Sequence, residues 1–159
     1  MYLLADLKST DRKTQLEQIN AFMNRRPYVE DSANWGVPDY WETPLEFLHK
    51  SGDCEDYSIA KYMSLRLLGW PAEAMRIVVL RDLKLNVPHA VLVVYLNDDA
   101  WVLDNRILRI VRARSIDNYQ PVYSLNELHW WSYGNDRSKL PAEPPVDGIW
   151  PAAAQRDGK

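Results

Sequence analysis

The sequence predicts an α+β domain, with helices in the first half of the chain and an antiparallel sheet after them. Apolar residues recur at helical spacing in 10–24 and 53–69, whereas 76–80 and 89–96 are rich in β-branched residues, which favour strands. Helices followed by a run of strands are typical of α+β folds. The 159 residues are enough for one domain with a sizeable core.

The segments between these helices carry their own signals. The helix over 10–24 is followed by 30–40, which is rich in Asp, Ser, Asn, Gly and Pro and is expected to be a loop. Thr43 and Pro44 then predict the start of a short helix, with Thr43 as N-cap, and Glu46 completes a capping box.

The next helix is predicted to begin at once, with Asp53 as its N-cap and Cys54 in its first turn. Gly69 and the following proline are typical of a helix end. Apolar residues continue this helix at four-residue spacing, namely Ile59, Met63 and Leu67.

A hairpin is predicted after 89–96, because Asn and Asp at 97–98 favour a two-residue turn. That turn would place Asp104 opposite Val91, on the same face of the sheet as His89 and about 7 Å away along the diagonal. A turn one residue later would move Asp104 further from His89. The pairing of these two side chains is therefore allowed by the sequence but not fixed by it.

The remaining elements complete the predicted domain. We expect 101–103 to be the returning strand, 107–111 to form another strand, and the capping-box pattern in 124–131 to open a short helix. The chain is then divided into one domain over 1–140 and a Pro- and Ala-rich tail over 141–159.

Composition excludes several classes of function. With 19 Lys and Arg against 22 Asp and Glu, the net charge is -3, which gives no electrostatic reason to expect a nucleic-acid partner. No apolar run approaches the roughly 18 residues of a membrane span, so no membrane insertion is expected. One cysteine excludes an internal disulfide and a Cys-rich zinc site.

Three residues have the chemistry of a nucleophilic site. Cys54 lies at a helix N-terminus, where the helix dipole favours a thiolate. A thiolate nucleophile needs a base and the base needs an orienting acceptor, roles that His89 and Asp104 can fill. The structural alternatives are a buried cysteine that acts as a small apolar residue, a strand-end histidine and an ordinary turn aspartate.

Three carboxylates flank this cysteine, namely Asp53, Glu55 and Asp56. They can simply cap the helix and complement its dipole. However, carboxylates beside a nucleophilic thiol raise its pKa, and a hard cation with oxygen ligands would neutralise them. Calcium is therefore a plausible ligand, although the spacing is not that of an EF-hand.

The same residues resemble a known family, the bacterial transglutaminase-like cysteine proteinases. The resemblance extends over about 34–105. It is carried first by the block around the cysteine, 52–57, and by the residues that follow it, 59–62. His89 and the segment 103–105, which contains Asp104, then follow in the order in which the family has its His and Asp. The upstream segment 40–47, which contains aromatic residues, also resembles the family.

The resemblance implies a papain/transglutaminase-like fold, with the cysteine at a helix N-terminus packed on an antiparallel sheet. It implies Cys54 as nucleophile, His89 as general base and then acid, and Asp104 as the residue that orients His89. It also implies calcium as cofactor, with three acidic ligands, namely Asp53, Glu55 and Asp56. We expect the backbone N–H of Cys54 to contribute to an oxyanion hole.

The resemblance further implies a biological role. The expected substrate is a large repeat adhesin of the cell surface, cleaved near an Ala-Ala-Gly-type site. Cleavage of this adhesin is expected to regulate biofilm release. The expected partner is an inner-membrane cyclic-di-GMP receptor that sequesters the protease. Members of this family are exported, so a periplasmic location is expected by resemblance, although residues 1–6 do not have the pattern of a signal peptide.

Two other functions fit the same residues. The same Cys-His-Asp set can transfer the acyl group to an amine, which would make the protein a transglutaminase or amide-transfer enzyme. Alternatively, the protein is a non-catalytic, calcium-stabilised binding module with a Trp-rich groove. The second alternative predicts that Cys54→Ala leaves the function intact.

Overall fold

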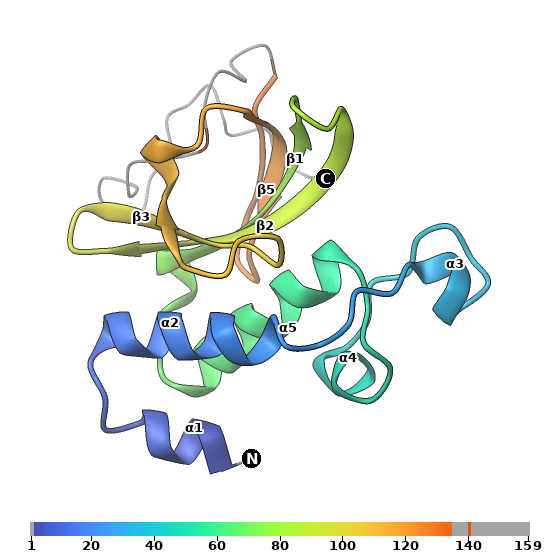
Figure 1. Cartoon of the computed structure of the whole chain (residues 1–159). Coiled ribbons are helices and arrows are strands. Elements are labelled where there is room, and N and C mark those ends of the chain that lie inside the picture. The colour runs from blue at the N-terminus through green and yellow to red at the C-terminus, as the bar shows by residue number, and fades with distance from the viewer. Residues whose placement is uncertain (1, 135–139, 141–159) are drawn as a thin grey trace.

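The computed structural model describes residues 2–134 and 140, and a six-stranded antiparallel sheet forms one layer of the fold (Figure 1). The strands lie in the order β4-β3-β2-β1-β5-β6. The strands are β1 (Met75–Asp82), β2 (Val87–Leu96), β3 (Asp99–Leu103), β4 (Val111–Arg112), β5 (Tyr119–Leu125) and β6 (Trp130–Ser132). The helices are α1 (Tyr2–Leu7), α2 (Arg12–Met23), α3 (Asp31–Asn34), α4 (Pro44–Lys50) and α5 (Cys54–Leu67), with short 3-10 turns at Ala72–Ala74 and Ala113–Ser115. This arrangement confirms the predicted α+β class.

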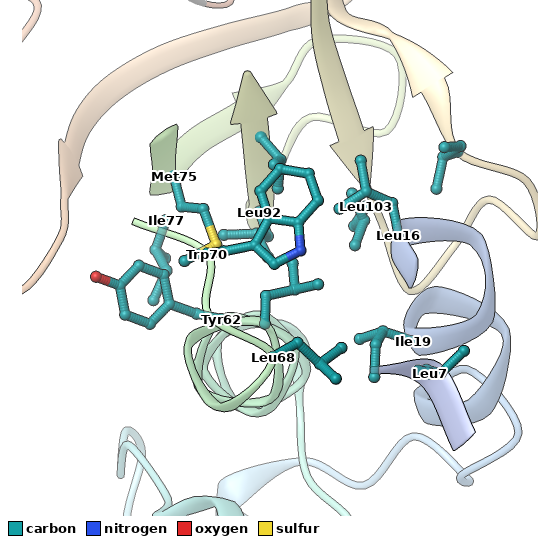
Figure 2. Close-up of a cluster of buried hydrophobic side chains, with 13 residues drawn as sticks. Leu7, Leu16, Ile19, Tyr62, Leu68, Trp70, Met75, Ile77, Leu92 and Leu103 are labelled. Carbon is teal, nitrogen blue, oxygen red and sulfur yellow. The ribbon is translucent and has the colours of Figure 1, made fainter. Parts of the chain in front are cut away.

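Helices α2 and α5 lie side by side and cover one face of the sheet (Figure 1). Their apolar side chains form a core with the strands, in which Trp70 lies in the middle, near Met75 and Leu92 (Figure 2). The indole N–H of Trp70 donates to Gln15 Oε1 at 2.8 Å, so this buried polar group is satisfied. Burial of each large apolar side chain contributes about 1.5–3 kcal/mol, so this core fixes α5 against the sheet.

The other face of the sheet carries a second core. Successive residues of a strand point to opposite faces, so Leu92 packs under the helices while Val91 and Val93 pack on the far side. The sheet is strongly curved (Figure 1). The second core includes the side chains of Tyr119 and Trp131. Both faces of β2 are therefore buried, which explains its nearly continuous apolar sequence.

The hairpin between β2 and β3 has the first of the two predicted registers. Asn97 and Asp98 both have a positive φ, 52° and 59°, as a two-residue type I′ turn requires. Leu96 pairs with Asp99, and Leu92 pairs with Leu103. This register places the next residue, Asp104, on the face of the sheet that carries His89.

Helix α5 begins and ends as predicted, but it buries a different row of side chains. Of the predicted apolar row, Met63 is 40% exposed and Leu67 is 67% exposed. The buried row is instead Tyr57, Lys61 and Leu65. A lysine interrupts that row, so the apolar spacing indicated the helix correctly but did not mark its most buried row of side chains.

The predicted helix over 124–131 is wrong. Strand β5 continues to Leu125, and the chain returns in β6 after a tight turn. Asn126 Oδ1 accepts the backbone N–H groups of Leu128 and His129, at 2.9 and 2.8 Å. The polar residues that resembled a capping box therefore form a turn between two strands.

Two other local predictions are corrected. Most of 107–111 is irregular, because the Asn20 side-chain amide donates to the carbonyl oxygens of Ile107 and Leu108 and holds this segment against α2. The expected loop over 30–40 contains the short helix α3. The predicted tail, 141–159, lies outside the described residues.

A search of the described residues finds no helix with the length and apolar character that a membrane crossing requires.

Candidate active site

Cys54 is the first residue of α5, and its thiol is half-buried. Asp56 fixes this helix start, since its Oδ2 accepts the N–H of Asp53 at 3.0 Å and its Oδ1 accepts the N–H of Glu42 at 2.7 Å. A Cβ atom on Gly52 would lie 2.2 Å from Asp56 Oδ2, so only glycine fits there. These contacts hold the thiol at the positive end of the helix dipole.

His89 is the third residue of β2, and its side chain is completely buried. Its Nε2 lies 2.9 Å from Asp104 Oδ1. Because the carboxylate accepts a proton from Nε2, the lone pair of the neutral ring is on Nδ1. Nδ1 is buried and has no hydrogen-bond partner within residues 2–134 and 140, so it is the atom that can act as a base.

Asp104 directly follows β3 and is fully buried. Its Oδ1 also accepts the N–H of Arg106 at 2.9 Å, and its Oδ2 accepts the hydroxyl of Tyr119 at 2.6 Å. Burial alone would raise the pKa of Asp104, but the hydrogen bonds from His89 and Tyr119 and the charge on His89 hold it below its ordinary value. Asp104 is therefore an ionised acceptor that orients the imidazole.

Cys54 and His89 line the same cleft, which has a volume of about 320 Å³. The thiol lies against the backbone N–H of Ala90, the residue after His89, and this contact favours the thiolate. Aromatic and proline side chains form much of the rest of the wall, namely Tyr28, Pro38, Trp41, Pro88 and Tyr123. A thiol and an imidazole that line one cleft, with a carboxylate on the second nitrogen of the imidazole, are suited to acyl transfer through a thioester.

Comparison with known proteins agrees with this geometry. A family model described as bacterial transglutaminase-like cysteine proteinase matches residues 5–137. The chain belongs to this family.

Solved structures of one relative support the family and the fold. Calcium-bound LapG from Legionella pneumophila is 36% identical to this chain with a TM-score of 0.75, and the match covers 82% of this chain and 74% of that one. EGTA-treated LapG from the same organism is 34% identical with a TM-score of 0.76, and covers 87% of this chain and 76% of that one. No curated protein sequence is significantly similar. The predicted papain/transglutaminase-like fold is thus confirmed.

The three residues expected at a cysteine proteinase site come together in this family member. Cys54 and His89 meet in the cleft although they lie on different elements, and Asp104 binds the far side of the imidazole. The sequence did not identify Tyr119, the second side chain on Asp104. No motif indicated it, because it comes from β5, whose register depends on the whole sheet.

The acidic residues around Cys54 oppose its ionisation. The thiol donates to Glu55 Oε2 at 3.1 Å. Burial raises the pKa of the Cys54 thiol, and the charges on Glu55 and Asp53 raise it further. The carboxylates beside Cys54 thus oppose its ionisation, the effect expected from the sequence.

The predicted acidic cluster is larger in the structure. Carboxylate oxygens of Asp31, Asp53 and Asp56 lie within 4.8 Å of one another, and so do those of Asp31, Asp39 and Glu55. Burial, then a hydrogen bond with Glu55, then the charges of neighbouring carboxylates raise the pKa of Asp53. Burial raises the pKa of Asp56 to about 7 despite two backbone N–H donors. The sequence missed Asp31 and Asp39, because both lie in a segment whose path has no periodic signal.

This cluster has the donors that a calcium ion needs. Asp31 Oδ1 and Asp53 Oδ1 are buried and have no hydrogen-bond partner among the described side chains and backbone. Buried oxygens of this kind are normally paired, and hard cations prefer carboxylate oxygens. The donor set thus fits calcium, the ion named in the calcium-bound structure of LapG.

Proposed function

We propose that this protein is a calcium-dependent cysteine endopeptidase with Cys54, His89 and Asp104 as its catalytic residues. The observation that carries the proposal is that Cys54 and His89 line the same cleft while Asp104 binds Nε2 of the imidazole. The basic nitrogen of His89 is therefore Nδ1, which has no hydrogen-bond partner among the described residues.

In the first half of the reaction, His89 Nδ1 takes the proton of the Cys54 thiol, and the thiolate attacks the carbonyl carbon of the scissile peptide bond to form a tetrahedral intermediate. The backbone N–H of Cys54, at the N-terminus of α5, is suited to stabilise the oxyanion. The C–N bond then breaks, the amine leaves with a proton from His89 Nδ1, and a thioester on Cys54 remains.

In the second half, water attacks the thioester carbonyl while His89 Nδ1 accepts a proton from it. Collapse of the second tetrahedral intermediate breaks the C–S bond and releases the new carboxyl terminus, and the proton on His89 Nδ1 returns to the Cys54 sulfur. The imidazolium that forms in both halves is stabilised by Asp104, which holds Nε2–H throughout.

The carboxylates that would hold calcium belong to two overlapping groups, namely Asp31, Asp53 and Asp56, and Asp31, Asp39 and Glu55. Asp56 also fixes the turn at the start of α5. Calcium would supply positive charge that compensates the carboxylates beside Cys54 and lowers the free energy needed to ionise the thiol. The raised pKa of Cys54 without such compensation supports this role.

We further propose that the substrate is a large repeat adhesin of the cell surface, cleaved near an Ala-Ala-Gly-type site. Family membership supports a protein substrate. Bulky aromatic walls, formed by Tyr28, Trp41 and Tyr123, favour small side chains next to the thiol. By resemblance, we place the protein in the periplasm, where an inner-membrane cyclic-di-GMP receptor of the LapD type controls biofilm release by sequestering it.

Product analysis tests the proposal and separates it from acyl transfer. An adhesin fragment containing an Ala-Ala-Gly segment is incubated with the protein, calcium and an excess of a small primary amine. We expect two fragments, the first ending in a free carboxyl group, as measured by mass spectrometry. A first fragment that carries the amine would indicate an amide-transfer enzyme instead.

A further inference from the structure

Tyr119 contacts two members of the triad from a third strand of the sheet. It is the first residue of β5, pairs with Asp82 of β1 and is 5% exposed. Its hydroxyl donates to Asp104 Oδ2 at 2.6 Å. Its ring lies edge-on to the His89 imidazole, with the ring centres 5.7 Å apart.

The two oxygens of Asp104 are held by different donors. Oδ1 accepts from His89 Nε2 and from the Arg106 N–H, whereas Oδ2 accepts from the Tyr119 hydroxyl. Without that hydroxyl, Oδ2 would be a buried carboxylate oxygen without a side-chain donor, which is unfavourable. The carboxyl group would then gain freedom to rotate about Cβ–Cγ and turn Oδ1 away from Nε2.

We propose that Tyr119 is a positioning residue of the triad, whose hydroxyl locks the Asp104 carboxylate so that Oδ1 faces His89. This inference rests on the proposed catalytic role of Cys54, His89 and Asp104. Tyr119 does not line the cleft and so does not contact the substrate. Burial and the charge of Asp104 raise the pKa of Tyr119, so the phenol stays protonated and remains a donor.

The test compares two variants that each lose one buried hydroxyl. Tyr119→Phe keeps the ring against His89 and removes only the bond to Asp104. Tyr133→Phe is the matched control, because Tyr133 is also buried and its hydroxyl is 2.9 Å from the Ser124 hydroxyl, with no contact to the triad. Melting curves of both variants establish that each is folded.

The first readout is alkylation of the protein by iodoacetamide in calcium buffer at neutral pH. Because Cys54 is the single cysteine, intact mass reports this thiol alone and no substrate is needed. We expect the rate to fall about 10- to 100-fold in Tyr119→Phe, the range seen when the hydrogen-bond partners that orient metal-ligating side chains are removed. Tyr133→Phe should keep the native rate.

The second readout is the tautomer of His89 in protein labelled with ¹⁵N-histidine. We expect the native protein and Tyr133→Phe to show Nε2–H, and Tyr119→Phe to populate the Nδ1–H form as well. Native alkylation and a native tautomer in Tyr119→Phe would overturn the proposal. The proposal would also be overturned if Tyr119→Phe lost cooperative melting while Tyr133→Phe kept it. The Tyr119 hydroxyl would then be needed for folding and not for positioning the triad. Neither readout depends on peptide cleavage, so failure of the proposed protease activity is detected separately.

Discussion

At the scale of single residues, Asp104 determines which nitrogen of His89 is basic. We expect Asp104→Asn to lower peptide hydrolysis by roughly 10²- to 10⁴-fold, because an amide can donate to Nε2 and so favour the wrong tautomer. Initial rates of cleavage measure the effect. Asp117→Asn is the control, since the Asp117 side chain is 89% exposed and pairs with Lys84. Equal rates for both variants would contradict the role of Asp104.

Lys61 is a second residue whose charge matters. It lies in the buried row of α5, and its Nζ has no hydrogen-bond partner in the described part of the chain. Burial lowers the pKa of Lys61 to about 7, although the charge of Asp104 opposes this shift. Between this value and the ordinary pKa, the folded protein binds fewer protons than the unfolded chain. The free energy of unfolding therefore rises with pH over this interval.

We expect Lys61→Met to remove this pH dependence. The native protein should gain stability relative to Lys61→Met as pH rises from 7 to 9, by at most about 3 kcal/mol. Urea titrations at several pH values measure the free energy of unfolding of both proteins. Lys8→Met, at an exposed position, should follow the native pH dependence. If the free energy of unfolding of Lys61→Met changed with pH as that of the native protein does, Lys61 would not titrate in this range.

At the scale of elements, the start of α5 joins the nucleophile to the acidic cluster. We expect Gly52→Ala to displace the Asp56 carboxylate, because the new Cβ would overlap with it. The free energy of unfolding should fall by about 1–3 kcal/mol, and the stabilisation by calcium should shrink. Melting temperatures with calcium and with EGTA measure both effects.

Gly69→Ala is the control for Gly52→Ala, because it introduces backbone strain at the other end of α5 without touching the proposed calcium ligands. Gly69 follows α5 at a φ of 84°, so alanine is strained there, but no atom lies near its Cβ position. We expect this variant to be destabilised and to keep its full response to calcium. A reduced calcium response in both variants would show that the effect is not local to Gly52.

The sequence predicted elements best where local chemistry and tertiary packing agree. The capping box at Thr43 and the turn at Asn97 and Asp98 involve neighbouring residues, and both are confirmed. The pattern in 124–131 was misread, because the same polar residues serve equally well in a turn, and β1 was available to pair with β5. Local propensity cannot detect such a competing strand.

The same distinction applies to the site. Cys54, His89 and Asp104 were identified because each has a distinctive chemistry and the hairpin register relates two of them. Asp31 and Tyr119 were missed, because long-range folding alone brings them to the site. The roles of Asp31 and Tyr119 depend on contacts with residues distant in the sequence. Neither residue belongs to a local sequence motif that would have identified it.

At the scale of the whole molecule, calcium should stabilise the fold. We expect the melting temperature to rise with calcium concentration and to fall with EGTA, because a ligand that binds the folded state alone shifts unfolding. Asp31→Asn should weaken this response, since Asp31 carries an unpaired buried oxygen in the cluster. Asp98→Asn, in an exposed turn, should retain it. Equal calcium responses in the two variants would exclude Asp31 as a ligand.

The central claim is that Cys54 is the nucleophile of a calcium-dependent protease. The most direct measurement is a gel assay of an adhesin fragment with native protein and with Cys54→Ala, each in calcium and in EGTA. We predict cleavage by the native protein in calcium alone, with Cys54→Ala folded and inactive. Cleavage by Cys54→Ala at the native rate would contradict the claim, and native cleavage that persists in EGTA would contradict the role of calcium.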